Sequence, residues 1–340
     1  MRRFAPFLPA LIGGAALTGC AAAGIVSPLP TATVVARGET TPVGTANADA
    51  ADDPAIWHNA ANPAASLIVG TDKKAGLYVY DMTGAVLDYA PDGMLNNVDL
   101  VDMGEAGVIV AASDRSDPLN AAIALYRLSP DGKLTPIGSV PGGAGEAYGF
   151  CLYRAGGSLH AFSVIKDGTV HEYALDLDTP ASTLVRTVSV PSQAEGCVAD
   201  PRDGTLYVGE EAAGIWRFAP GQTAGTIVAA IDNEQMVADV EGLALVPEGK
   251  DGGWLVASSQ GDSAYALYRL PDMAYAGRFR VAQGTFGATD ETDGIEVKTG
   301  NFGPTFPAGI FIAQDGVNKG GAQNFKLARW DEILIALEQQ

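Results

Sequence analysis

A short motif, a polar residue followed by an apolar run of strand type, recurs along this chain at intervals of roughly 46 to 52 residues. A second strand, which ends in charged or amide residues, follows each copy about 13 to 23 residues later. The copies are Asp53–Trp57, Asn97–Leu100, Tyr148–Phe150, Glu195–Val198, Glu241–Ala244 and Asp293–Glu296, with Asp53 aligned 46 residues before Asp99. Self-similarity at this period is typical of a β-propeller with one repeat per blade. The sequence therefore predicts an all-β fold of six blades around a central channel, with polar residues ringing one end of it.

The first 46 residues do not share this pattern. Arg2 and Arg3 precede an apolar stretch that ends in Leu17-Thr18-Gly19-Cys20, which is typical of a secretory signal. This end also resembles a bacterial lipobox, which implies cleavage before Cys20 and a lipid on its sulfur. We expect a signal peptide of lipoprotein type at 1–19, a tether at 20–46, and the propeller at 47–340. The protein is then exported, either periplasmic or anchored in the outer membrane, and touches the membrane only through this lipid.

The expected propeller contains two cysteines, Cys151 and Cys197, near the starts of neighbouring repeats. An exported protein resides in an oxidising compartment, where a disulfide between these two cysteines can form. Strands of neighbouring blades need not bring their α-carbons within bonding range. The sequence leaves both states open and favours two buried thiols.

The chain is acidic, with 40 Asp and Glu residues against 21 Lys and Arg and a formal net charge of −19. Nucleic-acid binding is disfavoured because it requires a basic face. The same composition suits several calcium ions, whose ligands are carboxylate and carbonyl oxygens. We expect a monomer with no nucleic-acid partner, and a short helix only at the end of the chain, over 330–337.

The ends of the second strands carry the charges that distinguish the repeats. In chain order they are Lys73, Arg115, Lys166, Glu211, Gln260 and the pair Gln314-Asp315. The first three repeats are therefore cationic, whereas the last three add the carboxylates of Glu195, Asp239, Glu241 and Asp293. Crowded carboxylates raise one another's pKa values and destabilise the fold unless cations neutralise them. A ligand with several negative groups would pair with Lys and Arg in the first three repeats. It would also bind calcium ions held by the carboxylates of the last three.

At this point the residues resemble a known family, the β-propeller phytases. The likeness runs in order from about residue 47 to 335 and is carried by DDPAIW at 52, LNNVDL at 95, SDRSD at 113, YGFCLY at 148, EGCVAD at 195, GEEAAGIWRF at 209, DVEGLAL at 239, ASSQGDSAYALYRL at 257, TDGIEV at 292 and AQDGVNKGG at 313. Members of this family are six-bladed, calcium-dependent enzymes that release phosphate from phytate, usually as its calcium salt. One departure is the loop 283–290, which is shorter and poorer in acidic residues than in the family.

The resemblance implies a role for each matching residue. Residues matching the metal-rich cleavage site are Asp52, Tyr148, Glu195, Glu211, Asp239, Glu241, Gln260 and Asp293. The cations Lys73, Arg115 and Lys166 match those that hold the scissile phosphate. A neighbouring phosphate would be held by Lys74, Asn96, Asp117 and Asp167. Asp53, with the backbone around Val98, resembles part of a buried structural calcium site.

The activity implied is hydrolysis of phytate to lower inositol phosphates and orthophosphate by metal-assisted attack of water. The catalytic residues would be Lys73, Arg115, Tyr148, Lys166 and Glu211. One alternative is a calcium-dependent six-bladed lactonase, which has no need of three cations at strand ends. Another is a non-catalytic exported propeller that binds anions or partners, and such a protein need not hold acids and cations together on one face.

Overall fold

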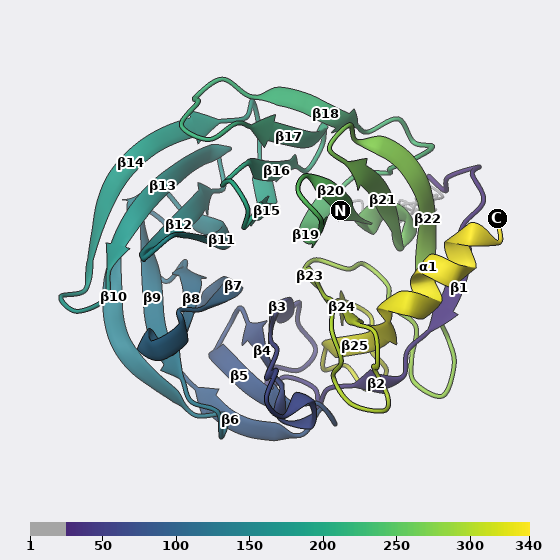
Figure 1. Ribbon diagram of the computed structural model, residues 1–340, viewed down its shortest axis with the longest axis horizontal. Helices are drawn as coiled ribbons and strands as arrows, with labels where there is room; N and C mark the ends of the chain where they lie inside the picture. The colour runs from purple at the N-terminus through teal and green to yellow at the C-terminus, as the bar shows by residue number, and fades with distance from the viewer. Residues whose placement is uncertain (1–24) are drawn as a thin grey trace, which may run out of the picture.

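Six β-sheets surround a central channel in the structure, a computed structural model that describes residues 25–340 (Figure 1). The first four blades are each built from four consecutive antiparallel strands. They comprise β3 Ala51–Trp57, β4 Leu67–Asp72, β5 Gly76–Asp81 and β6 Val86–Ala90; β7 Leu95–Asp102, β8 Val108–Asp114, β9 Asn120–Leu128 and β10 Leu134–Ala144; β11 Ala147–Ala155, β12 Ser158–Ile165, β13 Thr169–Asp176 and β14 Ala181–Ser189; and β15 Ala194–Ala199, β16 Leu206–Glu210, β17 Gly214–Phe218 and β18 Thr226–Ala230. The fifth blade contains β19 Val240–Glu248, β20 Gly252–Ser259, β21 Ala264–Leu270 and β22 Ala274–Ala282, and the sixth contains β23 Ile295–Lys298, β24 Ile310–Asp315 and β25 Asn324–Arg329. The predicted six-bladed, all-β propeller is confirmed.

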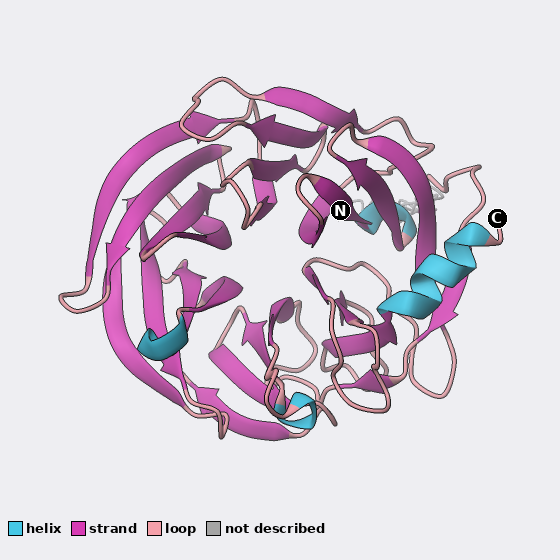
Figure 2. Cartoon of the chain, in the orientation of Figure 1, coloured by secondary structure: helices cyan, strands magenta, loops and turns pink. Residues whose placement is uncertain are grey.

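Helical structure within residues 25–340 is confined to α1, Trp330–Glu338, and three single turns (Figure 2). The turns are η1 Pro63–Ala65, η2 Gly104–Ala106 and η3 Gln260–Asp262. The expected terminal helix is therefore present. Trp330 and Ile333 on its inner face pack into the core that the fifth and sixth blades share. No helix of the described chain is long and apolar enough to cross a membrane.

The ring is closed by residues that the sequence assigned to the tether. Strand β2, Gly38–Glu39, pairs antiparallel with β25 as the fourth strand of the sixth blade. Strand β1, Ala32–Val35, pairs in parallel with β22 as a fifth strand of the fifth blade. The prediction of a tether at 20–46 is thus wrong over these strands, because a short Ala/Thr/Val segment gives no sign that a distant strand edge completes its hydrogen bonds. The predicted signal at 1–19 and Cys20 lie outside the described residues.

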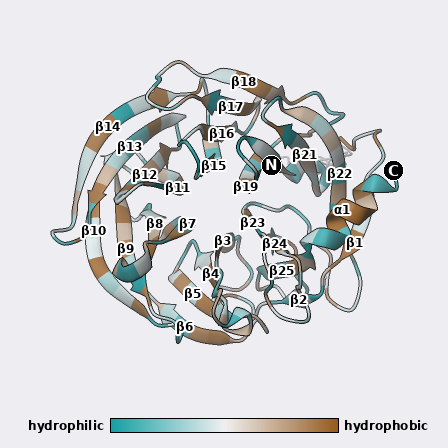
Figure 3. Cartoon of the chain, in the orientation of Figure 1, coloured by the Kyte–Doolittle hydropathy of each residue, from teal (hydrophilic) through white to brown (hydrophobic). Residues whose placement is uncertain are grey.

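The core lies between neighbouring blades. Val69 and Leu77 of the first blade, for example, form one cluster with Val98 and Val110 of the second. Similar clusters join each of the other five pairs of neighbours, and hydrophobic residues line the strands of every blade (Figure 3). Burial of apolar surface between sheets is the main stabilising term, so each blade depends on both neighbours.

The first strands of five blades contain a β-bulge near their start. The bulges span Asp52-Asp53, Asn96-Asn97, Tyr148-Gly149, Glu195-Gly196 and Glu241-Gly242. Asp293-Gly294 directly precedes the sixth first strand, β23. A bulge redirects a side chain out of the regular alternation, so each bulge changes where its polar residue points. The equivalent residues of the first two blades are therefore Asp52 and Asn96. The predicted alignment of Asp53 with Asp99 is out of register.

Glycine follows the polar residue in four blades because the next blade comes too close for a side chain. A Cβ on Gly149 would lie 1.7 Å from the carbonyl oxygen of Glu195, and one on Gly196 would lie 2.0 Å from that of Glu241. Gly242 and Gly294 approach the backbone of Asp293 and Asp52 in the same way. Hydrogen bonds from Gly242 N to Asp293 O and from Gly294 N to Asp52 O span 2.8 and 3.0 Å. These contacts hold the polar residues of successive blades side by side.

Cys151 and Cys197 form a disulfide, so the preference for two free thiols is wrong. Their α-carbons lie 5.8 Å apart, within the usual range for a disulfide. The close approach of Gly149 in β11 to the backbone of Glu195 in β15 brings the residues two positions further along each strand together. The bridge joins the third blade to the fourth beside the channel.

Candidate active site and metal centre

Two sets of residues, one inner and one outer, meet at one end of the channel. The inner set lies at or just before the starts of the strands that line the channel in Figure 1: Asp52, Asn96, Tyr148, Glu195, Glu241 and Asp293. The outer set directly follows the second strands: Lys73, Arg115, Lys166, Glu211, Gln260 and Gly316. Each outer residue donates its N–H, over 2.7 to 3.1 Å, to a carbonyl in the loop that enters the first strand of its blade. The prediction that the strand ends share one face is confirmed, with Gly316 rather than Asp315 as the sixth member.

Three buried carboxylates form the centre of the acidic half. Glu195, Glu211 and Glu241 each offer an oxygen, and these oxygens lie within 4.8 Å of one another. Burial and the charges of Asp52 and Glu241 raise the pKa of Glu195 well above its usual value. Burial raises the pKa of Glu211 as well, although a hydrogen bond of 2.8 Å from Gln193 opposes this. Such a group is stable in its ionised form only beside a cation.

One oxygen in this group has no protein partner. Among residues 25–340, Oε2 of Glu241 is buried without a hydrogen bond. Burial and the charges of Asp293 and Glu211 raise the pKa of Glu241 well above its usual value. A buried orphan oxygen within a cluster of carboxylates is suited to a hard divalent cation, which takes oxygen ligands. The donor set therefore fits the predicted metal.

Lys73 neutralises a second group of carboxylates, which belong to the first and sixth blades. Its Nζ lies 2.8 Å from Asp52, 2.9 Å from Asp293 and 2.8 Å from Asp49. Burial alone would lower the pKa of Lys73, but these carboxylates raise it overall, so the residue is a fixed cation. Gln260 donates to Asp293 Oδ1 over 2.7 Å. Burial and Asp52 together raise the pKa of Asp293 to about 7, against the opposing charge of Lys73.

Arg115 and Lys166 lie against the ring of Tyr148, at 5.2 and 4.8 Å from its centroid. Both cations also contact Glu146, whose Oε2 is 3.9 Å from Lys166 Nζ. Burial and the charges of Glu195, Glu211 and Glu241 raise the pKa of Tyr148, so this phenol stays protonated. The two cations and the tyrosine hydroxyl form a donor face beside the carboxylate group.

Asn96 connects the two halves from within the core. It is fully buried, its Oδ1 accepts from Arg115 Nη1 over 2.6 Å, and its Nδ2 donates to Glu195 over 2.8 Å. This arrangement orients the guanidinium and the carboxylate relative to each other. It favours a supporting role over the direct contact with a neighbouring phosphate that the resemblance implied.

The two remaining predicted metal ligands lie in different places. Asp239 is next to the carboxylate group, where its charge raises the pKa of Glu211 and Glu241, and burial raises its own pKa. Asp53 instead lines a cavity of about 30 Å³ deeper in the channel, and its Oδ2 accepts from Val98 N over 3.0 Å. Burial and Asp52 raise the pKa of Asp53 well above its usual value. Asp53 therefore lines a different cavity from the one beside the Lys73 cluster, and its role as a ligand of a structural calcium stays a prediction.

The other residues predicted for a neighbouring phosphate are exposed. Lys74, Asp117 and Asp167 lie in the loops after β4, β8 and β12. The carboxylates of Asp117 and Asp167 accept backbone N–H bonds of 2.9 Å from Leu119 and Thr169. In the described structure these two acids therefore stabilise their own turns.

Three side chains in the site were not predicted from the sequence. They are Asp49 on Lys73, Glu146 on Arg115 and Lys166, and Gln193, whose Nε2 lies 2.8 Å from Glu211 and 3.4 Å from the Tyr148 hydroxyl. Each precedes a polar residue of the inner set by two or three positions, namely Asp52, Tyr148 and Glu195. The loop that enters each first strand approaches the same face as the inner set. A polar residue two or three positions before an inner-set residue is therefore the sequence signal that could have identified these side chains.

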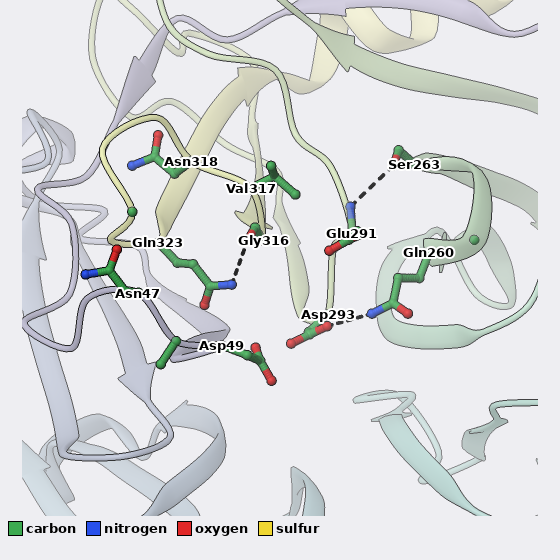
Figure 4. A pocket seen from close by; sticks show the side chains of 13 residues that line it. Asn47, Asp49, Gln260, Ser263, Glu291, Asp293, Gly316, Val317, Asn318 and Gln323 are labelled. Atoms are coloured by element: carbon green, nitrogen blue, oxygen red, sulfur yellow. Dashed lines mark hydrogen bonds between the residues drawn. The ribbon is translucent and has the colours of Figure 1, made fainter. Parts of the chain in front are cut away.

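A cavity of about 780 Å³ opens beside the Lys73 cluster (Figure 4). Asp49, Asp293 and Gln260 point toward it from three segments distant in sequence. Glu291 and Asn318 also line it. The site is therefore open to solvent at the point where the carboxylates and Lys73 meet.

Comparison with known proteins identifies the family. A family model described as "Phytase" matches residues 9–340. The chain is 40% identical over 325 residues to a 3-phytase of Bacillus subtilis strain 168, covering 88% of this chain and 84% of that protein. A chain in the crystal structure of the mitotic checkpoint complex overlays with a TM-score of 0.51 at 12% identity, covering 84% of this chain and 79% of that one, a likeness of fold alone. The match to the family model over nearly the whole sequence, together with this identity, shows that the chain belongs to the phytase family.

Proposed function

We propose that this protein is a calcium-dependent phosphomonoesterase that hydrolyses phytate to lower inositol phosphates and orthophosphate. The observation that carries the proposal is the position of Glu195, Glu211 and Glu241 directly beside Arg115, Lys166 and Tyr148 on one face. The similarity to a protein named 3-phytase supports the same substrate.

The carboxylate group would hold calcium through Glu195, Glu211 and Glu241, with Asp52, Asp239, Asp293 and Gln260 around it. Bound there, the metal would neutralise phosphate oxygens and increase the acidity of water. The orphaned Oε2 of Glu241 and the raised pKa values of these acids support this assignment. Asp53 would contribute to a separate structural calcium in the channel.

The protein's own groups perform the rest of the reaction. Phosphoryl transfer depends mainly on positioning and on stabilising the charge of the phosphoryl oxygens. Arg115 is suited to forked contact with these oxygens, and Lys166 and Lys73 add fixed positive charge. Glu211, whose pKa is raised by burial, is suited to orient the attacking water and accept its proton. Direct attack by water needs no covalent intermediate on the protein.

The decisive experiment is phosphate release from calcium phytate by the purified protein, with and without a chelator. We expect release that stops on chelation and returns with added calcium. Equal release after complete removal of calcium would refute the metal assignment. Cleavage of a lactone with phytate left intact would favour the lactonase alternative, and binding without turnover would favour the non-catalytic one.

Two variants separate the roles of the cations and the acids. Arg115→Ala should lower turnover by on the order of 10² to 10³, and excess calcium should not restore it, since the acids remain. Glu211→Gln should raise the calcium concentration needed for half-maximal rate, and excess calcium should restore part of the rate. The reverse pattern of calcium rescue would overturn these assignments.

We also propose that the protein is exported and carries a lipid on Cys20, as a periplasmic or outer-membrane-anchored lipoprotein. The Leu17-to-Cys20 motif supports this, and so does a disulfide in the folded domain. Cys20→Ser should abolish lipid attachment and move the protein into the aqueous phase on detergent partitioning. An unchanged distribution of that variant would refute the anchor.

A further inference from the structure

Glu146 lies between the two cations that the proposed function assigns to the phosphate. One carboxylate oxygen pairs with Arg115 Nη2, and the other lies 3.9 Å from Lys166 Nζ. Both cations also lie against the ring of Tyr148. The carboxylate is therefore at the point where a phosphoryl group contacting both cations would place its oxygens.

The backbone at Glu146 is held firmly. Its carbonyl accepts from Lys166 N over 3.1 Å, and the preceding Gly145 donates to Leu119 O over 2.8 Å. Gly145 also forms an isolated bridge with Asn120, in the segment that follows Arg115. The carboxylate of Glu146 is thus delivered to the cation pair by the fold and not by a freely moving loop.

The fold itself does not require an acid at this position. The carbonyls that accept the equivalent hydrogen bond in other blades belong to Ala50, Met94, Gln193, Asp239 and Asp290. Apolar, amide and acidic side chains all occur at this place. The blade architecture therefore does not explain why an acidic residue stands at position 146, and the explanation must lie in the contacts of Glu146 within the site.

We propose that Glu146 is an internal counter-ion that occupies the phosphate position of Arg115 and Lys166 and yields it to a phosphoryl group. This inference rests on the proposed function for the identity of the ligand. The three side chains together carry a net charge of +1, and removal of the carboxylate charge leaves +2. Glu146 therefore weakens anion binding, which speeds release of orthophosphate after each turnover. Its side chain is 27% exposed, so it can move into solvent when the phosphate enters.

The test is calorimetric titration of the full protein with inorganic phosphate at a fixed calcium concentration. Glu146→Gln should bind phosphate roughly 3 to 30 times more tightly, the range expected for one partly exposed charge near the ligand. Inhibition of phytate hydrolysis by phosphate should strengthen by a similar factor, while KM falls and kcat falls with slower product release. Glu105→Gln, in the exposed turn η2, is the matched control and should leave phosphate affinity, inhibition by phosphate, KM and kcat unchanged.

Unchanged or weaker phosphate binding in Glu146→Gln would overturn the inference, because Glu146 would then be inert or would serve to hold the cations. Glu146→Ala, which copies the equivalent Ala50, is the second variant and should also bind phosphate more tightly. Loss of folding in both variants would show that the fold needs the carboxylate and would likewise overturn the proposal. Since phosphate binding requires no turnover, tighter binding without phytate hydrolysis would refute the proposed function and leave this inference standing.

Discussion

Replacing Gly196 by alanine tests whether close contact between blades builds the carboxylate group. The new Cβ would lie 2.0 Å from the carbonyl oxygen of Glu241, 3.0 Å from its carbonyl carbon and 3.2 Å from Gly242 Cα. These atoms are backbone and cannot rotate away. The fourth and fifth blades must therefore separate by roughly 1 Å to reach a normal contact distance.

The separation should have two measurable effects. Overpacking against rigid atoms costs about 3 kcal/mol, which lowers Tm by roughly 4 to 6 °C for a domain of about 300 residues. It also moves Glu195 relative to Glu241, so the calcium concentration for half-maximal phosphate release should rise by roughly tenfold, as for other changes to groups that orient metal ligands.

Thermal unfolding and calcium titrations of phytate hydrolysis measure these effects. Gly157→Ala is the matched control, because a Cβ there meets nothing within 4 Å, and its Tm and calcium dependence should stay at wild-type values. If Gly196→Ala behaved like Gly157→Ala in both assays, the contact between blades would not be what positions the carboxylates.

The other predictions concern stability. Replacing Cys151 and Cys197 together by alanine opens a loop of 46 residues and should lower the free energy of unfolding by about 4 kcal/mol; an unchanged denaturation midpoint would contradict the disulfide. Lys73→Ala leaves Asp52 and Asp293 without their cation, so unfolding should become easier by about 3 to 5 kcal/mol without calcium, and calcium should restore part of this; a loss that calcium leaves untouched would count against the pairing. Burial raises the pKa of Asp99 to about 6 and that of Glu296 to about 8. Carboxyls with raised pKa values stabilise the fold below their unfolded pKa near 4 and lose this contribution as pH rises through the folded values. The Tm of the calcium-free protein should therefore fall between about pH 4 and 8, and Glu296→Gln should flatten the upper part of this decline; identical melting profiles for the two proteins would exclude Glu296 as the cause.

The repeat itself determined the number of blades and most members of the site. A strand pattern that recurs six times can bury its apolar faces only against its neighbours, which favours a closed ring. In such a ring equivalent strand ends must share one face, so the positions of Lys73, Arg115, Lys166 and Glu211 followed from the sequence. The polar-then-glycine pattern marked the inner residues in four blades, because only glycine permits the approach of the next backbone.

Contacts between distant segments were decided only by the tertiary structure. Local sequence does not predict which residues pair over such distances. Examples are the pairing of β2 with β25, the Cys151–Cys197 disulfide, and the ion pairs of Lys73 with Asp49 and of Glu146 with Arg115. The start of the bulge at Asp52 rather than Asp53 belongs to the same class, since no glycine marks it. A periodic sequence specifies which positions are equivalent, whereas bond formation depends on distances that only the closed ring sets.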